Sequence, residues 1–397
     1  MTTWRSTPPP SAAPGTPGVL ALLTDLFGRL HAEQIRYCHW KSNEHLGTSL
    51  QGTTDLDVLV LRKDARRLAR LLTEVDFKPF RKLTGFDYPG IEDYLGFDAD
   101  TGRLSHLHVH YQLTLGEKFL KGYRLPWEDL ALATRRWDAE QGLYAIDSGL
   151  EALLLVTRAA LKLRARDYVR AAAGYAYLGE GALRELSWLA RRADGDHLRS
   201  VARALVGDRS AELLRDIVAA PAPSIRQLVA FRRSVRPHLD TYRMYGAWDA
   251  LRRRWMREWG WGWAAVTNRA RGLKQRSTRT APQGGLTVCV SGPQTVATTV
   301  ACQLVSWLAP EIAVVPALGE GARSSLARRA RARGMVVVAD RPPTGPADHP
   351  PDLILELSDS AAHRFGRASD AHTVYLDGEA PPASLLLQAQ RAVWECI

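Results

Sequence analysis

A chain of 397 residues is long enough for two or three domains, each with a core of its own. Its hydrophobic content of 46% and charged content of 24% are typical of a soluble globular protein. No run approaches the roughly 18 apolar residues of a membrane span. The net charge of +11 favours polyanionic partners, although a GC-rich genome accounts for most of the arginine excess.

The cysteines and the N-terminus predict a cytoplasmic protein. Cys38, Cys289, Cys302 and Cys396 show no metal-type spacing, as expected of reduced thiols. The N-terminus lacks the basic and apolar regions of a secretory signal. Residues 1–18 carry several prolines among Ser, Thr and Ala, and we expect a disordered lead-in there.

Hydrophobic periodicity predicts a helix over 19–32, a short strand over 35–40 and a second helix over 64–75. Between them, Asp55 and Asp57 open the apolar run Val58-Leu59-Val60. Side chains of a strand alternate between its faces, so both carboxylates point the same way. Two carboxylates so close repel each other unless a cation lies between them, and Mg²⁺ prefers such oxygen ligands.

Ser42, at a predicted helix start, offers a hydroxyl and free backbone N–H groups to a phosphate. Metal-binding acids beside an anion-binding helix end indicate a nucleoside triphosphate as the ligand. The alternative is a strand that merely begins with two solvated aspartates.

These residues resemble the polymerase-beta-type nucleotidyltransferase superfamily, whose signature is Gly-Ser, a spacer, and Asp-x-Asp on a strand. Here residues 43–54 separate Ser42 from Asp55, and Lys41 replaces the glycine, where it could contact a phosphate as a point charge. The resemblance implies a metal held by Asp55 and Asp57 in a core over 19–147. It implies phosphate binding by five residues: Lys41, Ser42, Gly52, Thr53 and Thr54.

Three further strands and a turn are expected: strands over 77–83, 91–97 and 104–113, and a hairpin turn at 98–102. On the last strand His106, His108 and His110 share one face. The superfamily often places a third metal-binding carboxylate on a strand next to Asp-x-Asp, and no carboxylate lies on this face.

The three histidines have three interpretations. His108 or His110 completes a metal site that prefers Mn²⁺ or Zn²⁺, His108 being the assigned ligand. Alternatively, one histidine acts as general base on an acceptor hydroxyl. Otherwise the row is only a polar strand face. Asp93 and Asp98 are the remaining acids that could supply the missing ligand.

Ser148 and Glu151 match a capping box ahead of an apolar run, and helical spacing continues to about residue 270. We expect an all-helical domain over 148–271, which in this superfamily often covers the nucleotide. Within it four tryptophans form one helical stripe among arginines: Trp248, Trp255, Trp259 and Trp263. Packing in a core or between domains is the preferred interpretation. Peripheral contact with an anionic membrane through Trp255, Trp259 and Trp263 is the alternative.

Residues 272–284 are expected to be a linker, and 285–397 alternate strands and helices as in an open parallel sheet. The opening TVCVSGPQTVATT resembles the phosphate loop of thymidylate-kinase-like proteins. Gly292 and Thr299 remain, whereas Thr298 occupies the lysine position that a working loop needs. Asp340 and Arg341 resemble a later landmark. We interpret this part as a degenerate P-loop domain that has lost kinase catalysis.

The predicted fold class is therefore α/β and multi-domain, with a mixed-sheet core, a helical middle and a parallel-sheet tail. This order resembles fused bacterial proteins associated with surface-polysaccharide or natural-product gene clusters. The resemblance implies a nucleotidyltransferase using Mg²⁺ or Mn²⁺ to transfer a nucleoside monophosphate from a triphosphate to a small-molecule or carbohydrate acceptor. A non-catalytic nucleotide-binding scaffold and a nucleoside monophosphate kinase are the alternatives. No motif indicates sequence-specific nucleic-acid binding.

Overall fold

The computed structural model describes twelve stretches of the chain: 18–82, 88, 90–116, 120–172, 177–270, 280–281, 285–318, 330–331, 335–340, 351–358, 372–378 and 380–397. The expected lead-in over 1–17, most of the expected linker and Arg341 lie outside the described residues, as does the side chain of Trp263. The chain forms two compact units. The first comprises Met1–Val75, Tyr88–Glu92 and Leu107–Arg257, and the second comprises Asp76–Asp87, Asp93–His106 and Glu258–Ile397.

The sheet of the first unit is mixed, as the sequence predicts. Its strands are β1 (Tyr37–His39), β2 (Leu56–Val60), β8 (Arg136–Asp138), β9 (Leu143–Ala145) and the second half of β5 (Arg103–His110). Strand β2 pairs antiparallel with β1 and parallel with β5, and β1 pairs parallel with β9. The helices α1 (Ala21–Ala32) and α3 (Ala65–Glu74) bury one apolar side each, through residues such as Leu26 and Leu71.

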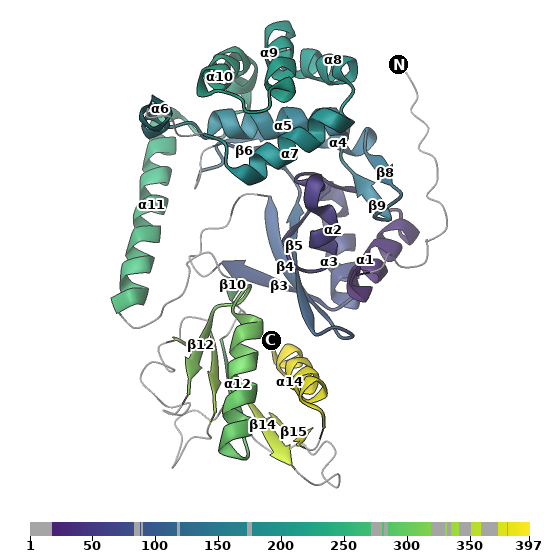
Figure 1. Ribbon diagram of the computed structural model, residues 1–397, viewed down its shortest axis with the longest axis vertical. Helices are drawn as coiled ribbons and strands as arrows, with labels where there is room; N and C mark the ends of the chain where they lie inside the picture. Colours follow the sequence, from purple (N-terminus) through teal and green to yellow (C-terminus); the bar gives the residue numbers. More distant parts are fainter. Residues whose placement is uncertain are drawn as a thin grey trace. The chain divides into compact units, whose positions relative to one another are not determined.

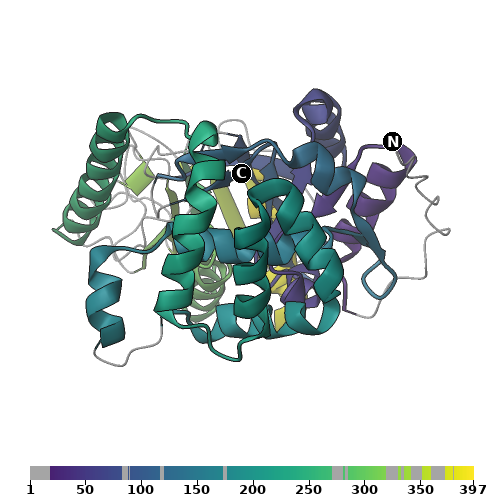
Figure 2. The same ribbon diagram turned by 90° about the horizontal axis from the view of Figure 1, so that it is seen from above.

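The helical region of the first unit surrounds one central helix, α5 (Ser148–Leu161). The others are α4 (Glu128–Ala133), α6 (Ala165–Ala172), α7 (Glu180–Arg192), α8 (Gly195–Val206), α9 (Asp208–Ala219), α10 (Ile225–Leu239) and the part of α11 (Ala247–Ala270) up to Arg257. Figure 1 shows α8, α9 and α10 along one side of α5, and Figure 2 shows these teal helices side by side from above. Because α5 is apolar on nearly every side, its residues 149–157 are all buried.

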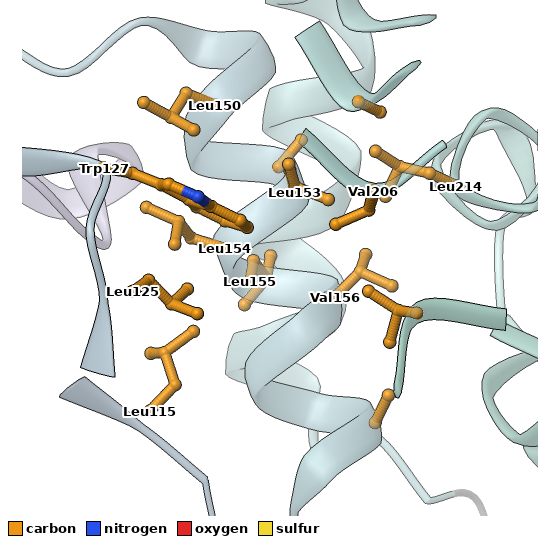
Figure 3. Close-up of a cluster of buried hydrophobic side chains, with 14 of the residues drawn as sticks. Leu115, Leu125, Trp127, Leu150, Leu153, Leu154, Leu155, Val156, Val206 and Leu214 are labelled. Carbon is orange, nitrogen blue, oxygen red and sulfur yellow. The ribbon is translucent and has the colours of Figure 1, made fainter. Parts of the chain in front are cut away.

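Side chains from segments before and after α5 in the sequence pack against this helix. Leu115 and Leu125, from the paired strands β6 (Leu113–Leu115) and β7 (Tyr123–Leu125), lie with Trp127 on one side of the helix, while Val206 and Leu214 lie on the other (Figure 3). All five are buried. This cluster is the main core of the first unit and fixes the start of α5 beside the sheet.

The start of α5 corrects the predicted capping box. Asp147, and not Ser148, is the N-cap: its Oδ1 accepts hydrogen bonds from the N–H groups of Gly149 and Leu150. Glu151 is buried and bonds elsewhere, so it does not return to the cap. The Ser-x-x-Glu pattern is present in the sequence, but an aspartate one position earlier is the stronger acceptor for the free N–H groups.

The second unit contains a five-stranded parallel sheet, in the order β12-β13-β11-β14-β15. Its elements are β11 (Leu286–Ser291), α12 (Gln294–Leu308), β12 (Val314–Ala317), β13 (Val336–Ala339), β14 (Leu353–Ser358), β15 (His372–Asp377) and α14 (Pro382–Cys396). Two residues of the expected linker form β10 (Thr280–Ala281), which pairs with β3 (Phe77–Lys82); β3 also pairs antiparallel with β4 (Ile91–Asp98). Phe80 and Phe97 pack on Trp394 of α14.

The fold is therefore α/β, with a mixed sheet, a helical region and a separate parallel sheet. Among the residues that the structure describes, no helix is both long enough and apolar enough to cross a bilayer.

Candidate functional site

Asp57 lies on the buried strand β2, directly opposite His108 in the parallel register with β5. His108 and His110 alternate with Leu107 and Val109, so both imidazoles project from the same face of β5. His108 Nδ1 lies 3.3 Å and His110 Nε2 lies 2.9 Å from Oδ1 of Asp57. The pairing of two strands thus brings two ring nitrogens onto one carboxylate oxygen.

Lys41 adds a positive charge to the same oxygen. Its ammonium lies 2.8 Å from Oδ1 of Asp57, and its side chain is 25% exposed. Burial opposes ionisation of Asp57, but Lys41 and hydrogen bonds from His108 and His110 outweigh it and hold the pKa of this carboxyl well below its usual value. Asp57 is therefore an anion at neutral pH and accepts from all three groups.

His110 is the innermost residue of this group, with 2% of its side chain exposed. Burial lowers the pKa of its imidazole to about 3, even though the neighbouring Asp57 favours the charged form. The ring is therefore neutral, and its Nε2–H donates to Asp57. Its other nitrogen, Nδ1, is buried without a hydrogen-bond partner among the described residues.

Asp55 stands at the exposed edge of the group. Half of its side chain is exposed, and its Oδ2 lies 3.8 Å from Nδ1 of His108. Asp55 and Asp57 thus approach the same ring nitrogen, the arrangement expected of two acids on one face of a strand.

The nitrogens of His108 and His110 and an oxygen of Asp57 lie within 4.8 Å of one another, so these residues could hold a metal ion. Two imidazoles and one carboxylate suit a first-row transition metal such as Mn²⁺ or Zn²⁺, whereas Mg²⁺ prefers oxygen ligands throughout. The donor set therefore fits Mn²⁺ better than Mg²⁺. Both ring nitrogens must release their protons, and Lys41 must leave the oxygen, when a metal binds.

His106 contacts a second pair of acids. Its Nδ1 lies 2.8 Å from Glu311, and its Nε2 lies 3.6 Å from the buried Asp93. Asp98 accepts hydrogen bonds from the backbone and hydroxyl of Thr101, and so stabilises the hairpin turn. Asp93 therefore pairs with His106 in the second unit, and Asp98 serves a turn.

The expectation of free N–H groups at Ser42 is wrong. Ser42 has a positive φ of 58°, and its N–H donates to Glu185 at 3.1 Å. The N–H of Asn43 donates to Glu151 at 3.0 Å, and its amide group donates to the other oxygen of Glu151. Two carboxylates from α5 and α7 therefore occupy the position in which a phosphate was expected.

The residues of the predicted Gly-Thr-Thr turn bond within their own segment. Gly52 has a positive φ of 70°, which a glycine adopts without strain. The hydroxyl of Thr53 donates to the carbonyl of Thr48, and the hydroxyls of Thr54 and Ser49 are 2.8 Å apart. These contacts close the turn that leads into β2.

Sequence reasoning missed Glu151 and Glu185 as site residues. Glu151 also lines a cavity of about 690 Å³ with Asn43, Trp137 and Trp188, which includes Arg136 and Arg192 in its wall. The local sequence around Glu151 indicated only a helix cap. Its hydrogen-bond partner Asn43 lies 108 residues away in the chain, so no local pattern could have revealed the contact.

Glu151 predicts a pH dependence of stability. Burial raises its pKa to about 7, against an ordinary value of 4.5. Between these values the folded state holds a proton that the unfolded state has lost, so the contribution of Glu151 to stability falls as pH rises from about 4.5 to 7, by at most about 3 kcal/mol. Urea unfolding at several pH values should show that Glu151→Gln removes this contribution, so that the unfolding free energy of the variant changes less negatively, or more positively, than that of the wild type over this pH range. The exposed Glu180→Gln should retain it, and an unchanged slope in Glu151→Gln would contradict the assignment.

The segment that resembles a phosphate loop is closed by its own contacts. Thr298, at the lysine position, donates to the buried Asp340 at 2.8 Å, and Gln294 donates to the same oxygen at 3.0 Å. The hydroxyl of Thr299 donates to a backbone carbonyl of its own helix. Gly292 has φ 138°, and a Cβ there would meet Leu357 at 2.7 Å.

A scan of the chain against protein-family models gives no match, and searches of curated proteins and of solved structures give none either. The chemistry of the Asp57 group is therefore the basis for a functional assignment.

Proposed function

We propose that the protein is a metal-dependent nucleotidyltransferase that transfers a nucleoside monophosphate from a triphosphate to a small-molecule or carbohydrate acceptor. The observation that carries the proposal is the convergence of His108 and His110 on Asp57, with Asp55 at the exposed edge of the group. A carboxylate with two imidazoles at metal-binding separation, open to solvent on one side, is the kind of site at which a metal can meet a triphosphate. The spacing of Ser42 from Asp55 and Asp57, which resembles the signature of the nucleotidyltransferase superfamily, supports the same proposal.

In this proposal Asp57, His108 and His110 hold the metal, and Asp55 extends the site toward solvent. A metal held there would supply positive charge that offsets the negative charge developing on the transferred phosphoryl group. Lys41 lies on Asp57 in the structure, and its ammonium would pair with a phosphate oxygen once that carboxylate held a metal. Asp55 accepts the proton of an acceptor hydroxyl or completes the metal shell.

The donor set predicts a metal preference. We expect the wild-type protein to bind Mn²⁺ at least about tenfold more tightly than Mg²⁺, because imidazole nitrogen is a poor ligand for Mg²⁺. His110→Ala should weaken Mn²⁺ binding by about 100-fold, while the exposed His238→Ala should leave it unchanged. Isothermal titration calorimetry measures both. Equal affinity for the two metals, or no effect of His110→Ala, would contradict the assigned ligands.

Incubation of the full chain with mixed nucleoside triphosphates, Mn²⁺ and an extract of its host, followed by mass spectrometry, tests the proposed reaction. The expected products are pyrophosphate and an acceptor heavier by one nucleoside monophosphate. Hydrolysis or binding without such a product would contradict group transfer.

A non-catalytic nucleotide-binding scaffold is the second candidate. It is favoured by two observations: carboxylates occupy the N–H groups of Ser42 and Asn43, and Thr298 and Gln294 close the degenerate P-loop on Asp340. A pseudo-kinase tail of this kind supports no phosphoryl transfer, and so a thymidylate kinase is the least supported alternative. Metal-dependent triphosphate binding with no product across a broad acceptor panel would favour the scaffold over the transferase.

A further inference from the structure

Helix α11 carries large apolar side chains that solvent reaches. Trp248 is 83% exposed, Leu251 56%, Trp255 61% and Met256 48%. Trp259, one turn further along, is 62% exposed. Packing in a core, the first half of the preferred sequence interpretation, is therefore wrong for these tryptophans, and packing between domains stays a prediction. Single exposed apolar residues are ordinary, but several on consecutive turns of one helix mark an interaction surface.

The four exposed residues between 248 and 256 lie on one face, which we name the tryptophan face of α11. At about 100° per residue they span an arc of about 140°. Arg257 lies opposite, and its guanidinium lies over the ring of Tyr88 at 5.1 Å. Arg253 stacks over the ring of Tyr245 at 4.5 Å. Arg257 and Arg253 both lie outside that arc, so neither of these contacts involves the tryptophan face.

Positive charge accompanies this face. Arg252 falls within the apolar arc and is exposed, and Arg253 and Arg254 flank it on either side. Four arginines and two acids lie between residues 249 and 258: Arg252, Arg253, Arg254 and Arg257, with Asp249 and Glu258. Arg253 bonds to Asp249 at 2.9 Å, and both Arg252 and Arg253 are exposed.

Tryptophan and arginine together fit one chemical environment. The indole ring is favoured at the boundary between headgroups and acyl chains, and the guanidinium pairs with lipid phosphate or carboxylate just above it. We propose that the tryptophan face of α11 docks on the surface of an anionic lipid bilayer, with the helix parallel to the membrane plane. Trp248, Leu251 and Trp255 enter the interface, and Arg252 binds the anionic headgroups. This inference does not depend on the proposed transferase activity.

Vesicle sedimentation of the full chain tests this proposal. The wild type should bind phosphatidylcholine vesicles containing phosphatidylserine at least about tenfold more tightly than pure phosphatidylcholine vesicles, and added salt should weaken the binding. The double variant Trp248→Ala/Trp255→Ala should lose about tenfold or more of this affinity, because less apolar surface enters the interface. Arg252→Glu should also lose about tenfold, through charge reversal.

A matched control is Arg209→Glu, which makes the same charge change at an exposed position on α9 and should retain wild-type binding. Thermal melting followed by circular dichroism verifies that all variants fold. We expect them to fold, because the substituted positions are exposed. No binding to either vesicle, equal binding to both, or unchanged binding of the tryptophan double variant would each overturn the proposal. A dimer in sedimentation velocity that the double variant abolishes, without vesicle binding, would assign this face to a second copy of the chain and also overturn it.

Discussion

Replacement of Asp57 by asparagine is expected to reduce nucleotidyl transfer by on the order of 10³-fold or more. Asp57 is the carboxylate that Lys41, His108 and His110 all contact at the same oxygen. Asparagine keeps the size of the side chain but removes the negative charge that a metal and Lys41 require. Formation of the nucleotidylated product, followed by mass spectrometry over time, measures the loss.

Asp25→Asn is the matched control, because the same substitution falls on an exposed residue of α1 whose partner is the exposed Arg29. It should retain full transfer. Asp55→Asn should be intermediate, since that side chain is half exposed and only approaches His108. Thermal melting separates lost chemistry from lost fold. Full activity in Asp57→Asn, with its fold intact, would remove the site from the reaction.

Trp127→Ala is expected to lower the free energy of unfolding by about 3–5 kcal/mol. Trp127 is 4% exposed and packs against α5 beside Leu150 and Leu154 (Figure 3). Its removal leaves a cavity that a helix buried on nearly every side cannot close. Because α5 also carries Glu151, which bonds Asn43, we expect the loss to reach the segment that precedes Asp57.

Urea unfolding followed by circular dichroism measures this change. Trp248→Ala is the control, since it removes the same side chain where it is 83% exposed, and it should change the unfolding free energy by less than about 0.5 kcal/mol. Equal effects of the two substitutions would show that Trp127 is not part of the core of the first unit.

Local sequence patterns predicted the elements and the faces of this site well. The alternation around Asp57 and around His108 and His110 fixed which side chains share a face. The same reasoning predicted a helix over the apolar run of α5, whereas its burial on nearly every side emerges only from the structure. These features depend on residues within a few positions of one another, which is the range over which periodicity carries information.

Contacts between distant segments could not be predicted in the same way. His106 belongs to the same alternating row as His108, yet it pairs with Glu311, 205 residues away. Ser42 resembles the serine of a phosphate-binding turn in its sequence context, yet its N–H donates to Glu185, 143 residues away. A pattern shows which atoms are available, and only the tertiary fold decides what reaches them.

The tryptophan stripe shows the same limit. Helical spacing placed Trp248 and Trp255 on one face, but it contains no information on what lies against that face. Burial was the more frequent outcome for such a stripe. In the structure both residues are exposed. The arginines beside them then indicate which kind of partner this face would bind.

The most direct test of the metal centre is electron spin echo spectroscopy of the Mn²⁺-loaded full chain with a non-hydrolysable nucleoside triphosphate analogue. Nitrogen couplings from two imidazoles together with a phosphorus coupling are expected, and His110→Ala should leave the coupling of a single imidazole. A spectrum with phosphorus but no imidazole nitrogen coupling would contradict a centre built by Asp57, His108 and His110.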